Sequence, residues 1–222
     1  MAFLAIPDGL SSMLREQFVR AQRRAQTTRP WFEPSEVSGI AEAEILEVDS
    51  ATEVVALGFV DLVGSTAWSQ TVDLRDQNLA LTRFESAAWS SAVLAGGRVV
   101  KMIGDAVFFV APDADAACRV AIDVCQAAGD DPMLPSARGA VGVGAVTPRE
   151  GDYFGPLVNL LARLVKVGDP GEVVATQEAA DLLTRGRWLL RELTPATLSG
   201  VEGVVEAFTV APVPPSRAQK VG

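Results

Sequence analysis

The segment 54–66, V-V-A-L-G-F-V-D-L-V-G-S-T, constrains the fold more than any other part of this 222-residue chain. Its branched and aromatic residues predict a buried β-strand that ends near Asp61. The chain then turns at Gly64, and Ser65 and Thr66 are residue types that cap a following helix. This pattern places a carboxylate at a sheet edge and unpaired backbone N–H groups beyond it, which suits a cation and a phosphate. Asp before Gly-Ser-Thr is also a common turn and cap, so this segment alone slightly favours a structural role.

The composition excludes several classes of function. A hydrophobic content of 49% is sufficient for the core of one full-sized domain. The net charge of -9 disfavours nucleic acids and acidic membranes as partners. The chain has no histidine, which excludes Ser-His-Asp catalysis and histidine-ligated zinc. With no apolar run long enough for a membrane span and no signal-peptide pattern at residues 1–10, we expect a cytoplasmic protein whose chemistry uses carboxylates, Lys, Arg and hard metal ions.

The rest of the chain alternates irregularly between helical and strand patterns. This alternation predicts an α+β fold, with one helical layer on an antiparallel-rich sheet. Segment 147–155 is interpreted as a polar loop. Cys118 and Cys125 share one face of a predicted helix, where we expect them to be reduced core residues. The predicted helices are 76–95, 113–128, 156–167 and 177–184, and the predicted strands are 98–103, 106–111, 138–146, 171–176 and two within 187–210.

The two ends of the chain differ in character from its centre. Residues 10–26 have apolar residues at helical spacing with arginines between them, and a proline-containing linker follows at 27–38. We therefore divide the chain into an N-terminal segment (1–45), a main domain (46–211) and a disordered tail (212–222). The N-terminal segment is either a packing appendage or a regulatory element that couples another domain to the main one.

Five polar residues stand out within these elements. Asp61 ends its strand and Asp105 lies at the tip of the 98–111 hairpin, so the two carboxylates can meet at one sheet edge and hold Mg²⁺ or Mn²⁺. Lys101 lies in an apolar strand, where its ammonium group needs water or a partner. Asn159 and Arg163 lie four residues apart on one helix face. Taken alone, Gly-Asp at a hairpin tip is better explained as a turn, and the polar stripe as the solvated side of a helix. Beside two carboxylates, however, an amide can orient a sugar and a guanidinium can stabilise a phosphoryl group.

Three of these segments together resemble the class III nucleotidyl cyclases, which are the adenylate and guanylate cyclases. F-V-D-L-V-G-S-T is similar to the first metal motif of that family, K-M-I-G-D to its base-selecting and second metal hairpin, and D-Y-F-G-P-L-V-N-L-L-A-R to its ribose and transition-state segment. The resemblance covers about Val54 to Val210, with the motifs in family order. It implies the family's fold, a ferredoxin-like or palm-like antiparallel-rich sheet covered by helices.

The resemblance also implies a role for each matching residue. These are two metal ligands (Asp61, Asp105) for two Mg²⁺ or Mn²⁺ ions per site, a base-recognition pair (Lys101, Asp152), a ribose-orienting residue (Asn159) and a phosphate-stabilising residue (Arg163). Adenine offers an acceptor at N1 and a donor at its amino group, which suit lysine and aspartate, whereas guanine reverses both polarities. We therefore expect ATP as the substrate and cyclic AMP and pyrophosphate as the products. The alternatives are a guanylate cyclase and a catalytically silent nucleotide-binding domain.

The family's sites form between two domains that pair head to tail, so the resemblance implies a homodimer with two equivalent sites. Lys101 and Asp105 would then serve different sites, although they are only four residues apart. Two features differ from the family pattern. Ser199 occupies the position where many relatives carry a lysine for the triphosphate, and segment 146–151 is shorter than usual and lacks the common His-Thr-Gly.

Overall fold

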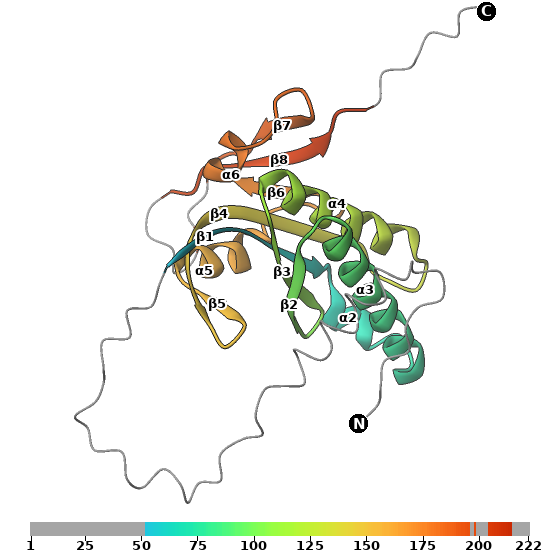
Figure 1. The fold of residues 1–222 in the computed structure, drawn as a ribbon. Helices are drawn as coiled ribbons and strands as arrows, with labels where there is room; N and C mark the ends of the chain where they lie inside the picture. The colour runs from blue at the N-terminus through green and yellow to red at the C-terminus, as the bar shows by residue number, and fades with distance from the viewer. Residues whose placement is uncertain (1–51, 196–197, 199–203, 215–222) are drawn as a thin grey trace, which may run out of the picture. The chain divides into compact units, whose positions relative to one another are not determined.

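The computed structural model describes residues 52–195, 198 and 204–214 (Figure 1). The predicted helix at 10–26, the linker at 27–38, Ser199 and residues 215–222 of the predicted tail lie outside this range. Pro212, the first residue of that predicted tail, is instead the last residue of a strand. The strands are β1 (Glu53–Leu62), β2 (Arg98–Ile103), β3 (Ala106–Ala111), β4 (Ala137–Arg149), β5 (Asp152–Phe154), β6 (Val173–Thr176), β7 (Trp188–Glu192) and β8 (Ala207–Pro212). The helices are α2 (Ser65–Ser69), α3 (Leu74–Leu94), α4 (Ala114–Asp130), α5 (Pro156–Leu164) and α6 (Gln177–Asp181).

One sheet organises these elements, in the strand order β2-β3-β1-β4-β6-β8-β7, and β5 pairs with β4 outside that path. All pairings are antiparallel except the one between β4 and β6. The first four strands have the order β4-β1-β3-β2, with α3 leading from β1 to β2 and α4 leading from β3 to β4. This is the ferredoxin-like arrangement, so the predicted fold class is confirmed.

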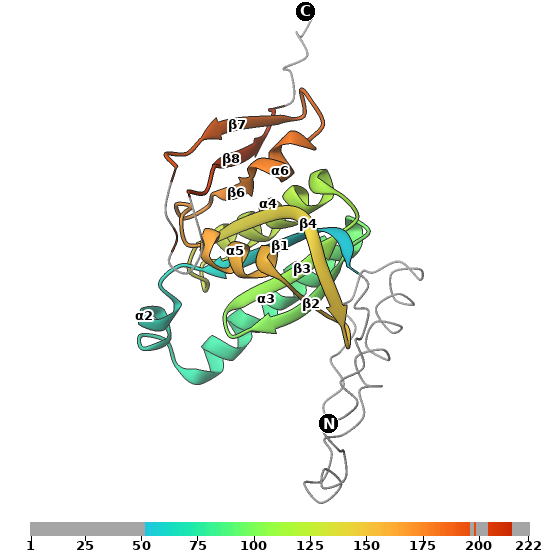
Figure 2. The same cartoon turned by 90° about the vertical axis from the view of Figure 1, so that its left-hand side faces the viewer.

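Helices cover both faces of the sheet (Figure 2). Helices α3 and α4 pack on one face, here called the α4 face, where side chains such as Val60, Phe84 and Phe109 form the larger core cluster. Helix α5 packs on the opposite face, here called the α5 face, over Leu57, Phe59 and Phe108. The expectation of a single helical layer was therefore wrong, because the apolar side of α5 also requires burial against the sheet.

The segment 147–155 forms a hairpin and not the predicted loop. Strand β4 continues to Arg149, and its residues Thr147 to Arg149 pair with β5. The turn residues Glu150 and Gly151 both have positive φ, 53° and 84°, as a two-residue hairpin turn requires. The polar composition of the segment concealed this pairing, because a hairpin arm outside the main sheet needs no alternation of apolar residues.

Helix α2 begins differently from the sequence prediction. Gly64 is its N-cap, with φ of 68°, and no side chain caps the helix. Ser65 and Thr66 are instead its first two residues. The backbone N–H groups of Ala67 and Trp68 both donate to the carbonyl of Gly64, at 3.0 Å. Gly64 therefore makes the turn without strain, because glycine tolerates the left-handed conformation.

Helix α4 carries the two cysteines, and both are buried and free, as predicted. Burial raises the pKa of Cys118 and of Cys125 to about 12, so these thiols remain protonated. Among the described residues, no helix has both the length and the apolar character needed to cross a bilayer.

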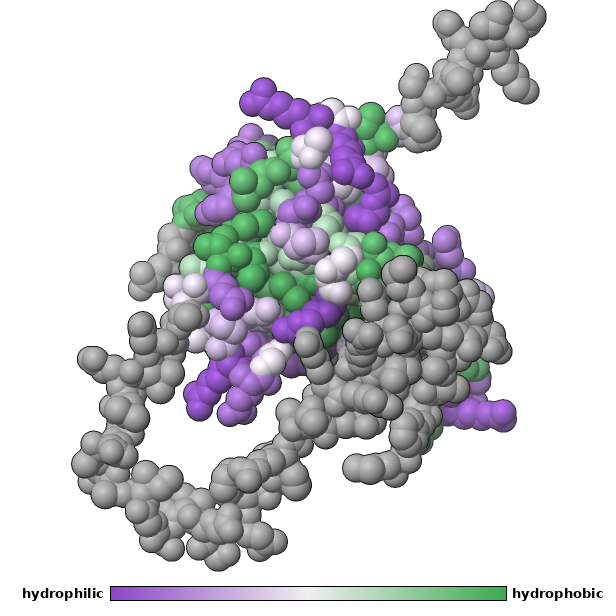
Figure 3. Space-filling model, viewed as in Figure 1, coloured by the Kyte–Doolittle hydropathy of each residue, from purple (hydrophilic) through white to green (hydrophobic). Residues whose placement is uncertain are grey.

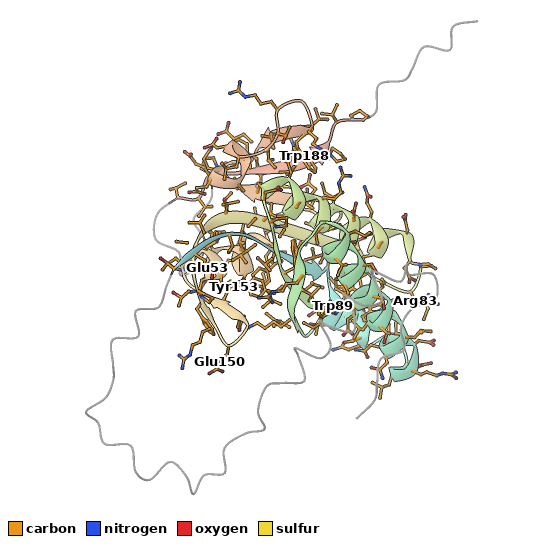
Figure 4. All side chains as sticks on the ribbon, viewed as in Figure 1. Glu53, Arg83, Trp89, Glu150, Tyr153 and Trp188 are labelled. Carbon is orange, nitrogen blue, oxygen red and sulfur yellow. The ribbon has the colours of Figure 1, made fainter. Side chains whose placement is uncertain are left out.

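Asp115, in the first turn of α4, ties that helix to the β7 end of the sheet. Its carboxylate accepts hydrogen bonds from the Thr184 hydroxyl, at 2.6 Å, and from the indole N–H of Trp188. Trp188 is the first residue of β7 (Figure 4). Burial alone would raise the pKa of Asp115, but these bonds and the charge of Arg187 outweigh it, so the pKa is below its ordinary value.

We predict that Gly58→Ala destabilises the fold by about 1–3 kcal/mol, because it overpacks the core. A Cβ at Gly58 would lie 2.1 Å from the Cζ atom of Phe109, which is fully buried and has no room to move. Gly144→Ala is the matched control, since its Cβ would lie at an ordinary 3.4 Å from Leu157. Urea unfolding measures both variants, and equal midpoints for the two would contradict this account of the packing.

We predict that the stabilising effect of Asp115 depends on pH. Because its pKa is lowered on folding, its contribution is fully present above the ordinary carboxyl value of 3.8 and is lost as the pH falls through the folded-state pKa. Asp115→Asn should therefore lower the free energy of unfolding near neutral pH, and the difference from the parent protein should shrink in acid. Urea titrations across this range test it, with Asp181→Asn as a control for removal of one exposed carboxylate. A difference that stays constant with pH would contradict the assignment.

Candidate functional site

Asp61 and Asp105 lie next to each other at one end of the sheet. Asp61 is the penultimate residue of β1 and points to the α5 face, as Phe59 does two residues earlier. Its neighbour across the β1–β3 ladder is Ala106, and Asp105 directly precedes that residue in the β2–β3 turn. The register of β1 and β3 therefore brings together the two carboxylates that the sequence analysis singled out.

The charges around Asp61 act on its pKa in opposite directions. Burial raises the pKa of Asp61, and the negative charge of Asp105 raises it further, while Arg138 opposes both effects. Two carboxylates that repel each other in a half-buried place favour a cation between them. In the described residues no cluster of three or more Asp, Glu, Cys or His side chains could hold a metal ion.

Two carboxylates nevertheless fit Mg²⁺ or Mn²⁺, because such hard ions are commonly held by one or two protein carboxylates together with substrate phosphates and water. Asp61 and Asp105 are the residues that would hold them. The strand register that places both carboxylates at the same end of the sheet is the observation that supports this fit.

Arg138 is a residue of this site that the sequence analysis missed. It lies opposite Asp61 in the β1–β4 ladder, with its Nη2 atom 3.4 Å from the Asp61 carboxylate, and its Nη1 atom donates to the carbonyl of Lys166 at 3.0 Å. Its Nε atom is buried and has no hydrogen-bond partner among the described residues. The available signal was an arginine at the start of an otherwise apolar, glycine-rich strand.

A β-bulge in the edge strand β2 directs Lys101 toward the α5 face. The register between β2 and β3 shifts between Val99 and Lys101. Val99 packs in the cluster on the α4 face, whereas Val100 packs against the cluster on the α5 face. Lys101 lies on the same side as Val100, with its ammonium group 5.9 Å from the centre of the Phe108 ring. Regular alternation would have placed Lys101 on the α4 face with Val99, so the bulge decides on which face of the sheet the lysine lies.

Lys101 forms an ion pair with Asp152, which is 51 residues further along the chain. The Asp152 carboxylate also accepts a hydrogen bond from the backbone N–H of Tyr153, at 2.9 Å. Both side chains retain solvent contact, with 44% of Lys101 and 24% of Asp152 exposed. The two residues to which the family resemblance gives base recognition are therefore in direct contact, one from the edge strand and one from the β4–β5 hairpin.

Asn159 and Arg163 lie on one side of α5, and the sequence of this helix explains their positions. Pro156 occupies the first turn, and Leu161 and Leu164 bury the opposite side. Asn159 is exposed, and the Arg163 guanidinium donates to the Asn159 carbonyl at 3.0 Å. No carboxylate of the described residues pairs with Arg163.

The structure thus groups the six predicted residues into three pairs, namely Asp61 with Asp105, Lys101 with Asp152, and Asn159 with Arg163. Within the described residues, no hydrogen bond or ion pair connects one of these pairs to another. Ser199, at the expected position of the triphosphate lysine, lies outside the described range.

Comparison with known proteins gives relatives over the same region. No protein-family model matches the chain. The uncharacterized protein Rv2212 of Mycobacterium tuberculosis is 34% identical over 168 residues, which is 76% of this chain and 44% of the relative. An adenylate cyclase of Glutamicibacter nicotianae is 34% identical over 148 residues, which is 67% of this chain and 36% of that protein. The chain therefore spans less than half the length of these relatives.

Solved structures share the fold. The guanylate cyclase domain of RhGC from Catenaria anguillulae, in complex with GTP, superposes with a TM-score of 0.66 at 22% identity, and the match covers 73% of this chain and 98% of that domain. The adenylyl cyclase CyaB from P. aeruginosa superposes with a TM-score of 0.63 at 21% identity, and the match covers 73% and 97% of the two chains. The same fold thus occurs in enzymes named for either base.

Proposed function

The chain has the catalytic-domain fold of the class III nucleotidyl cyclases, and from this premise we propose that it is an adenylate cyclase. In this reaction the ribose 3′-hydroxyl of ATP attacks the α-phosphorus, pyrophosphate leaves, and 3′,5′-cyclic AMP forms. The contact between Lys101 and Asp152 carries the proposal, because it joins a donor and an acceptor in the polarity that adenine requires.

Lys101 and Asp152 are proposed to recognise the base. The lysine ammonium donates to adenine N1, and the aspartate accepts from the exocyclic amino group. Guanine would meet each group with the wrong polarity, and each mismatched buried group costs on the order of 1–3 kcal/mol. The preference for ATP over GTP is therefore expected to be strong but not absolute.

Asn159, Arg163 and Arg138 are proposed to position and stabilise the reacting groups. Asn159 orients the ribose, and Arg163 stabilises the negative charge that develops at the transferring phosphorus. Arg138 has a guanidinium beside the Asp61 carboxylate, and its Nε–H has no partner among the described residues, so it suits the oxygens of the triphosphate. It offers a cation for the triphosphate in a chain with serine at position 199.

Asp61 and Asp105 are proposed to hold two Mg²⁺ or Mn²⁺ ions. When bound, the ions supply positive charge that lowers the pKa of the 3′-hydroxyl and neutralises the triphosphate. The aspartates fix that charge at the end of β1, next to Arg138.

The active form is proposed to be a head-to-tail homodimer. A complete site needs the Asp61 and Asp105 pair from one protomer and the two other pairs from its partner, which accords with the lack of a hydrogen bond or ion pair between these pairs among the described residues. Each homodimer then contains two equivalent sites. Residues 1–45 are proposed to influence this pairing as a regulatory segment.

The experiment that tests the function measures product formation by the purified protein with ATP or GTP, in the presence of Mg²⁺ or Mn²⁺ and over a range of protein concentrations. Cyclic AMP from ATP, with a specific activity that rises as dimers form, supports the proposal. Preferential formation of cyclic GMP would favour the guanylate cyclase alternative. Nucleotide binding without any product would favour the silent regulatory domain.

We predict that Asp61→Asn abolishes turnover and leaves the fold intact. The variant keeps the shape of the side chain but removes the charge that a divalent ion requires. Cyclic AMP formation and thermal unfolding measure the two effects separately. Substantial metal-dependent activity in this variant would contradict the role of Asp61 as a metal ligand.

We predict that Asp61→Asn and Arg163→Ala, each inactive alone, recover activity when they are mixed. A mixed dimer has one site with both defects and one site with none, so random exchange at equal amounts restores about a quarter of the parent activity. The single variants at the same total concentration are the controls. A mixture no more active than the sum of the two would contradict the head-to-tail arrangement.

A further inference from the structure

The β4–β5 hairpin reaches an edge strand that is not its neighbour in the sheet. Strand β4 is separated from β2 by β1 and β3. Lys101 in β2 is level with Phe108 in β3, Phe59 in β1 and Ala140 in β4, which are successive cross-strand partners. Ala140 lies nine residues before the end of β4, so the hairpin starts far along the sheet from Lys101. Asp152 nevertheless contacts Lys101. The hairpin therefore bends over the α5 face of β1 and β3. Figures 1 and 2 show this hairpin as an arm that projects from the sheet.

Arg98 holds this arm at both sides of Asp152. Its Nη2 atom donates to the carbonyl of Gly151 at 3.2 Å, and its guanidinium carbon lies 5.3 Å from the centre of the Tyr153 ring. One contact is thus made with the residue before Asp152 and the other with the residue after it. Figure 4 shows Glu150 at the tip of the arm and Tyr153 closer to the sheet.

Arg98 is also fixed relative to Lys101, because it is the first residue of β2 and Lys101 is the fourth. Strand β2 pairs with β3 at both residues, on either side of the bulge. A single backbone segment therefore supplies one member of the base-recognition pair and the clamp on the other. Among the described residues, β5 pairs only with β4, so no backbone ladder joins the hairpin to β2.

We propose that Arg98 is a positioning residue that sets base selectivity by fixing Asp152 opposite Lys101. This inference rests on the proposed function for its catalytic readout. Arg98 itself contacts the hairpin, at Gly151 and Tyr153, and is assigned no contact with the base. Its removal leaves Lys101 and Asp152 in the chain but frees the arm to move, so the acceptor for the adenine amino group is no longer held in place.

The test compares kcat/KM for ATP and for GTP in the parent protein and in Arg98→Gln. We expect the ratio of the two to fall about tenfold, which corresponds to the combined loss of a cation–π contact and a charged hydrogen bond. The value of kcat/KM for ATP should fall and that for GTP should not, because guanine has no amino group for Asp152 to accept from at that position. A merely structural role would lower both values equally, so an unchanged ratio would overturn the proposal.

Two further variants separate the contacts of Arg98. Arg98→Lys keeps a cation for the Tyr153 ring and one donor for the Gly151 carbonyl, so it should restore part of the ratio. Tyr153→Phe keeps the ring and should behave as the parent does. Arg83→Gln is the matched control, since Arg83 is another exposed arginine, paired with Asp131 on the α4 side of the chain. A ratio lowered equally in Arg83→Gln would overturn the assignment to Arg98.

Hydrogen exchange makes the inference testable without turnover. If the parent protein forms no product from either nucleotide, the proposed function fails, but the clamp still predicts faster amide exchange for the 147–154 hairpin in Arg98→Gln. The thermal midpoint of that variant should match the parent within about 2 °C, since Arg98 is exposed and outside the core. Hairpin exchange at the parent rate would overturn the positioning role.

Discussion

The pairing of β1 with both β3 and β4 is the constraint on which the site depends. Asp61 has Ala106 on one side and Arg138 on the other, and both neighbours are set by registers that run along buried strands. A slip of one residue in either ladder would turn Asp61 to the α4 face and expose Val60 or Leu62. Burial of the core therefore also holds Asp61 and Asp105 side by side. The two carboxylates repel each other, so their own interaction could not keep them together.

The pair proposed to recognise the base is held by a different kind of interaction. Lys101 and Asp152 lie on elements that share no ladder, and their relative position depends on a bulge, a hairpin turn and contacts at the solvent-exposed surface. The site thus combines two carboxylates fixed by the sheet, proposed to hold the metal ions, with a Lys–Asp pair held by side chains, proposed to read the base. In that proposal the base-reading pair is open to adjustment in a way that Asp61 and Asp105 are not.

Elements fixed by buried strands could be predicted from the sequence, whereas elements held by surface contacts could not. The buried strands β1, β3 and β4 were recognisable because their apolar runs are short, rich in β-branched or aromatic residues and bounded by turn residues. The hairpin at 147–154 was missed because its residues are polar and its pairing is local. Arg138 was missed because its importance depends on cross-strand register, which a single sequence does not reveal. The bulge at Val99 to Lys101 was equally hidden, although the lysine itself was recognised by its apolar surroundings.

The half-exposed position of the Lys101 and Asp152 pair has a consequence for how such a domain diversifies. An ion pair that retains solvent contact contributes only about 0–1 kcal/mol to folding, so exchanging both side chains leaves the stability of the domain almost unchanged. The core clusters on the two faces of the sheet do not include either residue. In the proposed function these two residues read the base, so a lineage can alter which purine it uses through two surface substitutions without passing through a poorly folded ancestor.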